Sequence, residues 1–277
     1  MANRLLGYQP GQGFLYQLSG TSKLLFFILV SVAVMTSYDT RFLIIVSLAS
    51  LLLFKKASIK WKDVSFVFAF VGFFALLNIL MIYLFAPHYG VDLYDSKTLL
   101  VDGPGPYDIT LEELFYLFNV AVKYLSTLPL AVIFLLTTHP SQFASSLNQL
   151  GLPYRFAYAV SLTLRYIPDL QEDFGTIRKA QEARGLELSK KASLLSRIKG
   201  NIQIITPLIF SSLERIETIS TAMELRRFGR YKKRSWYQAK AWTKKDSLLI
   251  LLSIIIVAIA ISLFYVNGGR FYNPFLY

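Results

Sequence analysis

Two arginines, Arg184 and Arg226, have the most informative spacing in this 277-residue chain. The nine residues 176–184 and the nine residues 218–226 are identical at five positions, at an offset of 42. In both copies an Ile, an Ala and the Arg are spaced three and four apart, so on a helix the Arg extends one apolar stripe. An apolar stripe that ends in a permanently charged guanidinium suits non-covalent binding of a partner. The sequence therefore predicts two equivalent helix ends, each of which inserts into a partner.

An ordinary helix end is the alternative interpretation of both sites. An Arg in the last turn interacts favourably with the helix dipole, and a glycine such as Gly185 commonly ends a helix. The second copy has Arg227 where the first has Gly185, so either Arg226 or Arg227 could make the second contact. The alignment at an offset of 42 favours Arg226.

Residues for other kinds of chemistry are few. The chain has no cysteine, which excludes disulfides, thiolate zinc sites and thiol catalysis. Neither His88 nor His139 belongs to an H-E-x-x-H motif, and residues 20–23 lack the glycine-rich loop that binds phosphates. His139 near Ser141 could imitate a catalytic dyad, but a helix-start role for Ser141 is the simpler interpretation. We therefore expect no cofactor, no metal and no catalytic residue, and an intramembrane enzyme remains an alternative.

The distribution of charge and hydropathy indicates which elements hold the arginines. The chain has a net charge of +12, 54% hydrophobic residues and a mean hydropathy of +0.46. Residues 1–138 carry nine Lys and Arg against eight Asp and Glu, whereas residues 139–245 carry 19 against eight. The basic excess thus belongs to one stretch, and the hydropathy indicates a membrane protein.

Four apolar runs precede that stretch and a fifth follows it. A helix needs about 20 residues to span a bilayer, a length that the last three runs reach, while the first two are short and are expected to be helical. Pro129 in the fourth run predicts a kink. Pro10, Gly11 and Gly13 interrupt the chain before any run, so no signal peptide is expected. The runs are Leu24–Ser37, Phe42–Phe54, Val64–Ala86, Leu111–Thr137 and Ser247–Val266.

The charges of the loops predict the orientation of these runs. Lysines cluster in residues 55–63, and residues 87–110 hold four Asp against one Lys. Under the positive-inside rule, 55–63 and 139–245 are cytoplasmic and 87–110 is outside. We therefore expect an all-α integral membrane protein of the cell membrane with about five transmembrane helices, a cytoplasmic N-terminus and an outer C-terminus. Its regions are predicted as 1–138, 139–245 and 246–277.

Proline and glycine divide residues 139–245 into amphipathic helices between the fourth and fifth spans. Pro140 and Gly151 bracket the first of them. The expected helices are 141–150, a helix over 154–166 that Pro168 ends, a helix from an Asp169 N-cap to Arg184, and a helix from Pro207 to about Phe228.

At the two arginine motifs the sequence resembles the transmembrane T component of energy-coupling factor transporters, the EcfT/CbiQ family. The motifs are Ala183-Arg184-Gly185 and Leu225-Arg226-Arg227, and residues 162–168 add to the likeness. Residues 18–24 are similar to the family's Leu-Asp-Pro-Arg-Thr-Lys-Leu but lack its Asp-Pro-Arg. The resemblance covers nearly the whole chain in the same order.

The resemblance implies a subunit with no ATPase activity of its own, which couples ATP hydrolysis mechanically to uptake. The resemblance implies two cytoplasmic ABC-type ATPase subunits, each of which binds one arginine motif. Arginine suits such a contact because a guanidinium binds a carboxylate through two hydrogen bonds. A small membrane subunit that binds a vitamin or a metal ion would be the third partner. The implied ATPase-docking residues are Ala183, Arg184, Gly185, Leu225, Arg226 and Arg227.

A second group of side chains in 139–245 is too apolar for a solvated cytoplasmic face. These residues predict either an interface with the substrate-binding subunit or internal packing against the spans. They are Phe143, Leu147, Leu150, Phe156 and Tyr158.

Two further functions remain as alternatives. Residues 226–234 form a basic run with aromatics, which could bind an anionic ligand such as nucleic acid. Its place just before the last span favours the headgroups of the lipid bilayer, so we expect no nucleic-acid partner. An ion-coupled transporter would need ionisable residues inside its spans, and Lys123 is the candidate.

Overall fold

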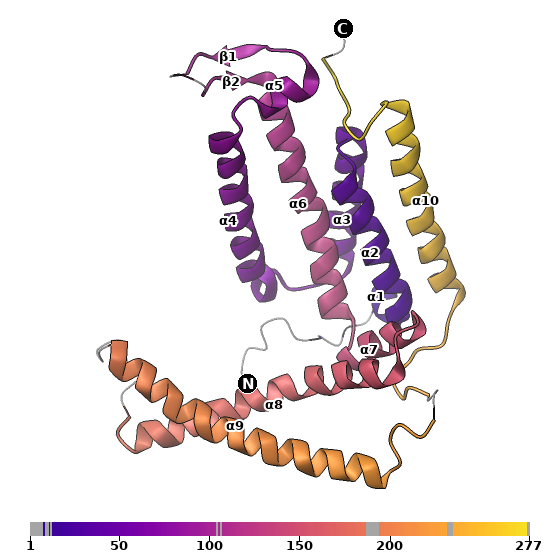
Figure 1. The fold of residues 1–277 in the computed structure, drawn as a ribbon. Coiled ribbons are helices and arrows are strands. Elements are labelled where there is room, and N and C mark those ends of the chain that lie inside the picture. The colour runs from indigo at the N-terminus through magenta and orange to yellow at the C-terminus, as the bar shows by residue number, and fades with distance from the viewer. Residues whose placement is uncertain are drawn as a thin grey trace. The chain divides into compact units, whose positions relative to one another are not determined.

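Figure 1 shows the computed structural model, which describes residues 8, 11, 13–103, 105, 107–186, 194–231 and 235–275. The described residues form two compact units. The first unit comprises those of 1–139 and 240–277, and the second comprises those of 140–239.

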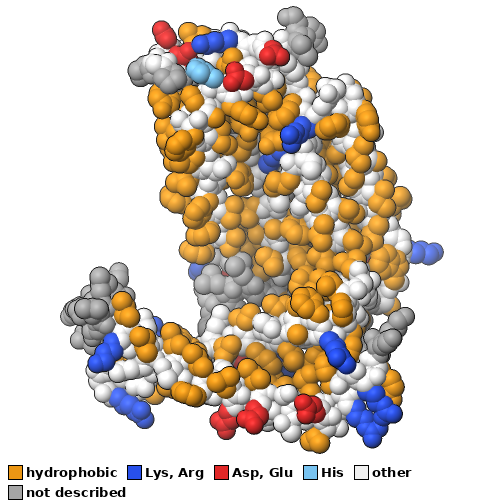
Figure 2. Space-filling view, viewed as in Figure 1, with side chains coloured by type: hydrophobic (Ala, Val, Ile, Leu, Met, Phe, Trp, Pro, Cys, Tyr) orange, Lys and Arg blue, Asp and Glu red, His pale blue; other side chains and the backbone are white. Residues whose placement is uncertain are grey.

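The first unit is a bundle of five long helices, and each predicted apolar run lies in one of them. Three are long and apolar enough to cross a membrane, α4, α6 and α10, whereas α2 and α3 have 17 residues each. Figure 2 shows hydrophobic side chains over the visible face of this bundle. The predicted helices are therefore confirmed, and five complete spans stay a prediction. The bounds are α2 (Gly20–Thr36), α3 (Thr40–Lys56), α4 (Trp61–Phe85), α6 (Leu111–Thr137) and α10 (Lys244–Val266), with a short α1 (Phe14–Gln17) before them.

Polar side chains cap the start of three of these helices, α2, α3 and α6. The Ser19 side chain accepts a hydrogen bond from the backbone of Ser22 at 3.2 Å and caps α2. Asp39 does the same for α3, and Thr110 does so for α6. Each cap satisfies a backbone N–H group that has no partner inside the helix.

Helix α6 is the most buried of the three long apolar helices and packs against α2, α3, α4 and α5 (Tyr89–Tyr94). Lys23, near the start of α2, donates to the carbonyl of Thr137 at the end of α6, at 2.7 Å. Lys123 in α6 donates to the carbonyl of Met35 near the end of α2, at 2.8 Å. Each ammonium group thus satisfies a carbonyl at a helix C-terminus, where positive charge is favourable. Lys123, the candidate for ion coupling, has this structural role.

The connection between α4 and α6 contains α5 and a small hairpin, which the all-α prediction missed. Strands β1 (Leu99–Val101) and β2 (Ile109–Thr110) pair antiparallel. The Lys97 ammonium lies 2.8 Å from the Asp108 carboxylate and, through this hydrogen bond, lowers the pKa of Asp108. The strands are too short to show an alternating pattern, so hydropathy alone does not reveal them.

The second unit contains α7 (Pro140–Gln149), α8 (Tyr154–Ala183) and α9 (Leu194–Leu225), and α8 and α9 are longer than predicted. Helix α8 continues through Pro168, so this proline does not end a helix and Asp169 is not an N-cap. Helix α9 begins before Pro207, which lies in its interior. An internal proline removes one hydrogen bond, whereas a full break would leave up to eight terminal backbone groups without helical partners.

Candidate functional site

Helix α8 ends in a Schellman motif that contains the first predicted arginine. Arg184 follows the last helical residue, and Gly185 adopts a φ of +90°. The N–H of Leu186 donates to the carbonyl of Gln181, and the N–H of Gly185 donates to that of Glu182, both at 3.0 Å. These two bonds satisfy carbonyls that the helix itself leaves unpaired.

Helix α9 ends in the same motif at the second predicted arginine. Arg226 follows the last helical residue, and Arg227 adopts a φ of +55°. The N–H of Phe228 donates to the carbonyl of Met223 at 2.9 Å, and the N–H of Arg227 donates to that of Glu224 at 2.8 Å. By position and backbone geometry, Arg226 therefore corresponds to Arg184 and Arg227 to Gly185. That Arg226 makes the second contact stays a prediction.

The two helix ends, residues 183–185 and 225–227, are called the arginine tips below. All six of their residues are exposed, and the Leu225 side chain is 81% exposed. Among the described residues, neither Arg184 nor Arg226 forms an ion pair with a carboxylate. No described carboxylate therefore competes with a partner for either guanidinium group.

Each long helix also carries exposed apolar side chains away from its tip. On α9 they follow one another three or four residues apart and form a stripe, as expected for one helix face. On α8 the exposed set is smaller. The residues of the stripe are Ile198, Ile202, Ile205, Ile209, Leu213 and Ile216, and those on α8 are Phe156, Ile167 and Leu170.

An ion pair that the sequence patterns did not predict joins α8 and α9. The Arg215 guanidinium lies 2.6 Å from the Asp173 carboxylate, and both side chains are about one-third exposed, at 37% and 35%. Figure 1 shows the two helices crossing. The two residues are 42 positions apart, which is also the offset of the arginine tips. Applying that offset to charged residues would have found the pair.

The five apolar residues predicted as an interface have three different environments. The Tyr158 ring packs on Phe228, with centroids 4.8 Å apart, and lies 6.3 Å from Trp236. Phe143 and Leu147 are half-buried. Leu150 and Phe156 are exposed, at 41% and 55%. Internal packing thus accounts for Tyr158, while Leu150 and Phe156 remain open to a partner.

The first unit has a fully buried carboxylate, Asp246, that was not predicted from the sequence. Asp246 accepts hydrogen bonds from the backbone of Ser19 at 2.8 Å and from the Ser22 hydroxyl at 2.6 Å. It also accepts from the backbone and hydroxyl of Thr243, at 2.8 and 2.6 Å. One carboxylate therefore joins the N-termini of α2 and α10. The spacing of Thr243 and Asp246, a capping-box pattern, was the available signal.

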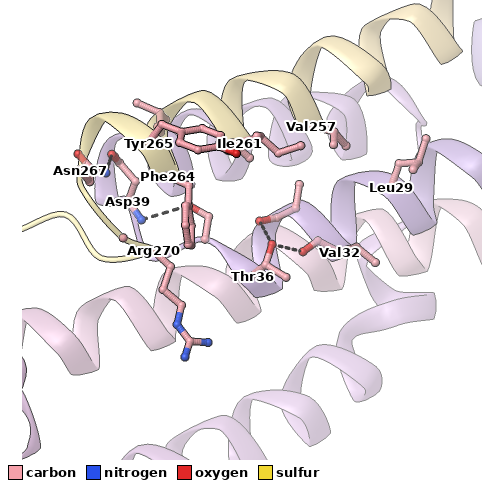
Figure 3. A pocket seen from close by; sticks show the side chains of 15 residues that line it. Leu29, Val32, Thr36, Asp39, Val257, Ile261, Phe264, Tyr265, Asn267 and Arg270 are labelled. Atoms are coloured by element: carbon pink, nitrogen blue, oxygen red, sulfur yellow. Dashed lines mark hydrogen bonds between the residues drawn. The ribbon is translucent and has the colours of Figure 1, made fainter.

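An apolar groove of about 620 Å³ lies between α2 and α10 (Figure 3). Val32 and Ile261 are among the side chains that line it. At its polar end, Asp39 accepts bonds from Arg41 and from Asn267, both at 2.8 Å. The carboxylate is thus held by structural partners at the tip between α2 and α3.

The two histidines lie too far apart to share a site. His88 precedes α5, which packs on the start of α6, whereas His139 follows the end of α6. With 27 residues, α6 is about 40 Å long. The His139 ring meets Tyr8 edge-on at 5.1 Å, and burial lowers the pKa of His139.

Comparison with known proteins gives a consistent result. The model of the CbiQ family, described as "Cobalt transport protein", matches residues 11–237. A Streptococcus equi protein is 27% identical over 92% of this chain and 95% of its own length. A Lactococcus lactis protein is 28% identical over 95% and 98%, and an Exiguobacterium sibiricum protein is 31% identical over 60% and 64%. All three are named energy-coupling factor transporter transmembrane protein EcfT.

Proposed function

This chain belongs to the CbiQ family and is a transmembrane component of an energy-coupling factor transporter, and we propose that it is the mechanical link between ATP hydrolysis and uptake. It is a non-catalytic subunit. In the proposed mechanism, two cytoplasmic ABC-type ATPase subunits hydrolyse ATP, and their motion passes through α8 and α9 to a small substrate-binding membrane subunit. The cargo would be a vitamin or a metal ion, chosen by that subunit.

The observation that carries the proposal is the matched geometry of the arginine tips. Two helices of one chain end in the same Schellman motif, each with an exposed Arg at the same position. A partner that binds one tip has the surface needed to bind the other. We therefore expect two similar ATPase subunits, each bound to one arginine tip.

The chemistry of the tips supports docking at a carboxylate-bearing groove. The guanidinium groups of Arg184 and Arg226 can each form two parallel hydrogen bonds with one carboxylate. The exposed Leu225 side chain adds apolar area beside one guanidinium. Buried apolar area around a charged anchor is the usual composition of an interface hot spot.

The substrate-binding subunit would contact a second surface, separate from the tips. The exposed Leu150 and Phe156 belong to it, together with the half-buried Phe143 and Leu147. Tyr158, whose ring packs on Phe228, would hold this surface in position. The orientation we propose has the N-terminus in the cytoplasm and the C-terminus outside, in agreement with the loop charges.

A double charge reversal, Arg184→Glu/Arg226→Glu, tests the proposal. We expect the ATPases to be lost when the complex is purified through this subunit, and uptake to fall to background, because both contacts become repulsive to a carboxylate. The control is Arg165→Glu/Lys179→Glu, which reverses two exposed cations of α8 that lie before its tip. Normal ATPase co-purification and uptake by the tip variant would refute the proposal.

A further inference from the structure

We infer that the Asp173–Arg215 ion pair is a pivot, which fixes the point where α8 and α9 cross and makes them move as one lever. This inference rests on the proposed coupling function. Asp173 and Arg215 touch neither partner nor cargo in this scheme. They are positioning residues for the arginine tips.

The two residues of the pair occupy equivalent positions in the internal repeat. Asp173 lies 11 residues before Arg184, and Arg215 lies 11 residues before Arg226. The contact therefore joins equivalent positions of two equivalent helices, as expected where a local twofold axis passes between them. At 1.5 Å per residue, each tip is about 16 Å along its helix from the contact. The two helix segments between the ion pair and the tips, the arms of the lever, are therefore equal in length.

The chemistry of the pair explains why it fixes this point. Less exposed residues of α9 lie before and after Arg215 at helical spacing, namely Leu208, Ser212 and Ile219. Leu208 and Ile219 are aliphatic, and the Ser212 hydroxyl is bonded within its own helix, so a shift by one turn would cost these residues little. A shift of one turn, about 5.4 Å, would separate the charges that now lie 2.6 Å apart. The contact between the two charges thus distinguishes this register from the one a turn away.

The exposure of the pair argues against a role in folding. Both side chains are about one-third exposed, so water and salt screen their attraction, and such pairs contribute little to stability. Loss of the pair should leave α8 and α9 helical and their tips intact. What changes is how far the helices slide at the crossing.

Equal arms and a fixed crossing have a mechanical consequence. When two like partners move the two tips symmetrically, the displacement turns α8 and α9 about the pair. Without the pair, part of the same displacement becomes sliding, and less of it reaches the rest of the chain. ATP would then be hydrolysed with less uptake.

A charge swap tests the pivot in the complete transporter, reconstituted with its ATPases and substrate-binding subunit in lipid vesicles. We expect Asp173→Arg and Arg215→Asp each to lower uptake per ATP hydrolysed by about fivefold, because an attraction becomes a repulsion of similar size. The double variant Asp173→Arg/Arg215→Asp should restore the ratio. Arg178→Glu is the control, because it disrupts the 2.9 Å pair with Glu182, which lies within α8 and joins no second helix.

A distance measurement separates the pivot from docking. The chain has no cysteine, so spin labels can be placed at Lys179→Cys and Thr221→Cys, equivalent exposed positions six residues beyond the pair. We expect a narrow distribution of label distances, a broader one with Asp173→Arg, and a narrow one again in the swap. An unchanged ratio and distribution in the single reversals, or no recovery in the swap, would overturn the pivot. ATPase co-purification should stay normal in all of them, so loss of docking through Arg184 and Arg226 is a distinct result.

Discussion

Asp246 in the first unit and Arg226 in the second are both charged side chains at an end of a long helix, but their surroundings are opposite. Asp246 is fully buried and accepts four hydrogen bonds from three residues of its own unit. Arg226 is exposed, and among the described residues no carboxylate pairs with it. Lys23 and Lys123 follow the pattern of Asp246, and Arg184 follows that of Arg226.

In the proposed topology the helices of the first unit lie in the bilayer and those of the second lie in the cytoplasm, and this difference then follows from the solvent of each unit. In a bilayer an unpaired polar group has no water to bind, so charged groups of the spanning helices must find partners inside the protein. Helices in water have no such requirement and can leave charged groups for other proteins. The comparison predicts that substitutions of charged groups in the first unit affect stability, whereas those at the tips of the second unit affect binding.

The largest expected effect on stability is that of Asp246→Ala. It leaves the backbone N–H groups of Ser19 and Thr243 without their acceptor, and it removes the shorter of the two hydrogen bonds open to the Ser22 hydroxyl. We expect the free energy of unfolding to fall by about 3 kcal/mol, because removal of one member of a buried network leaves the others unsatisfied. Thermal unfolding of the purified protein in detergent, followed by circular dichroism, measures this.

Asp169→Ala is the matched control in the second unit. Asp169 is exposed on α8, and its loss should change the free energy of unfolding by less than about 0.5 kcal/mol. Equal destabilisation by the two substitutions would contradict the comparison between the units.

The sequence predicted the elements of the first unit better than those of the second. Apolar runs identify Leu111–Thr137 and its neighbours directly, because a bilayer demands long uninterrupted hydropathy. In the second unit Pro168 and Pro207 suggested boundaries that the helices pass through. The arginine tips were found because they repeat. Asp173 and Arg215 were missed because no local pattern marks a contact between two helices, and only the 42-residue offset relates them.

Two glycines on helices provide a second test of the comparison. Gly90 in α5 packs so closely on α6 that an added Cβ would lie 2.6 Å from the backbone of Glu113. Gly175 in α8 has open space at the same position. We expect Gly90→Ala to lower the free energy of unfolding by about 2 kcal/mol through overpacking. Gly175→Ala should raise it by up to about 1 kcal/mol, because Ala favours the helix. The same sign for both, in the same thermal unfolding assay, would show that packing does not distinguish the two units.

The smallest effect concerns the difference between the two arginine tips themselves. Arg227 occupies the left-handed position that Gly185 occupies at the other tip, and a side chain there costs about 1 kcal/mol. Arg227→Gly should therefore raise the free energy of unfolding by about 1 kcal/mol, whereas Gly185→Ala should lower it by a similar amount. If Arg226 is the docking residue, Arg227→Gly retains ATPase co-purification while Arg226→Ala loses it. The reverse result would assign the contact to Arg227 and would mean that the two tips, although equal in backbone geometry, bind through different positions.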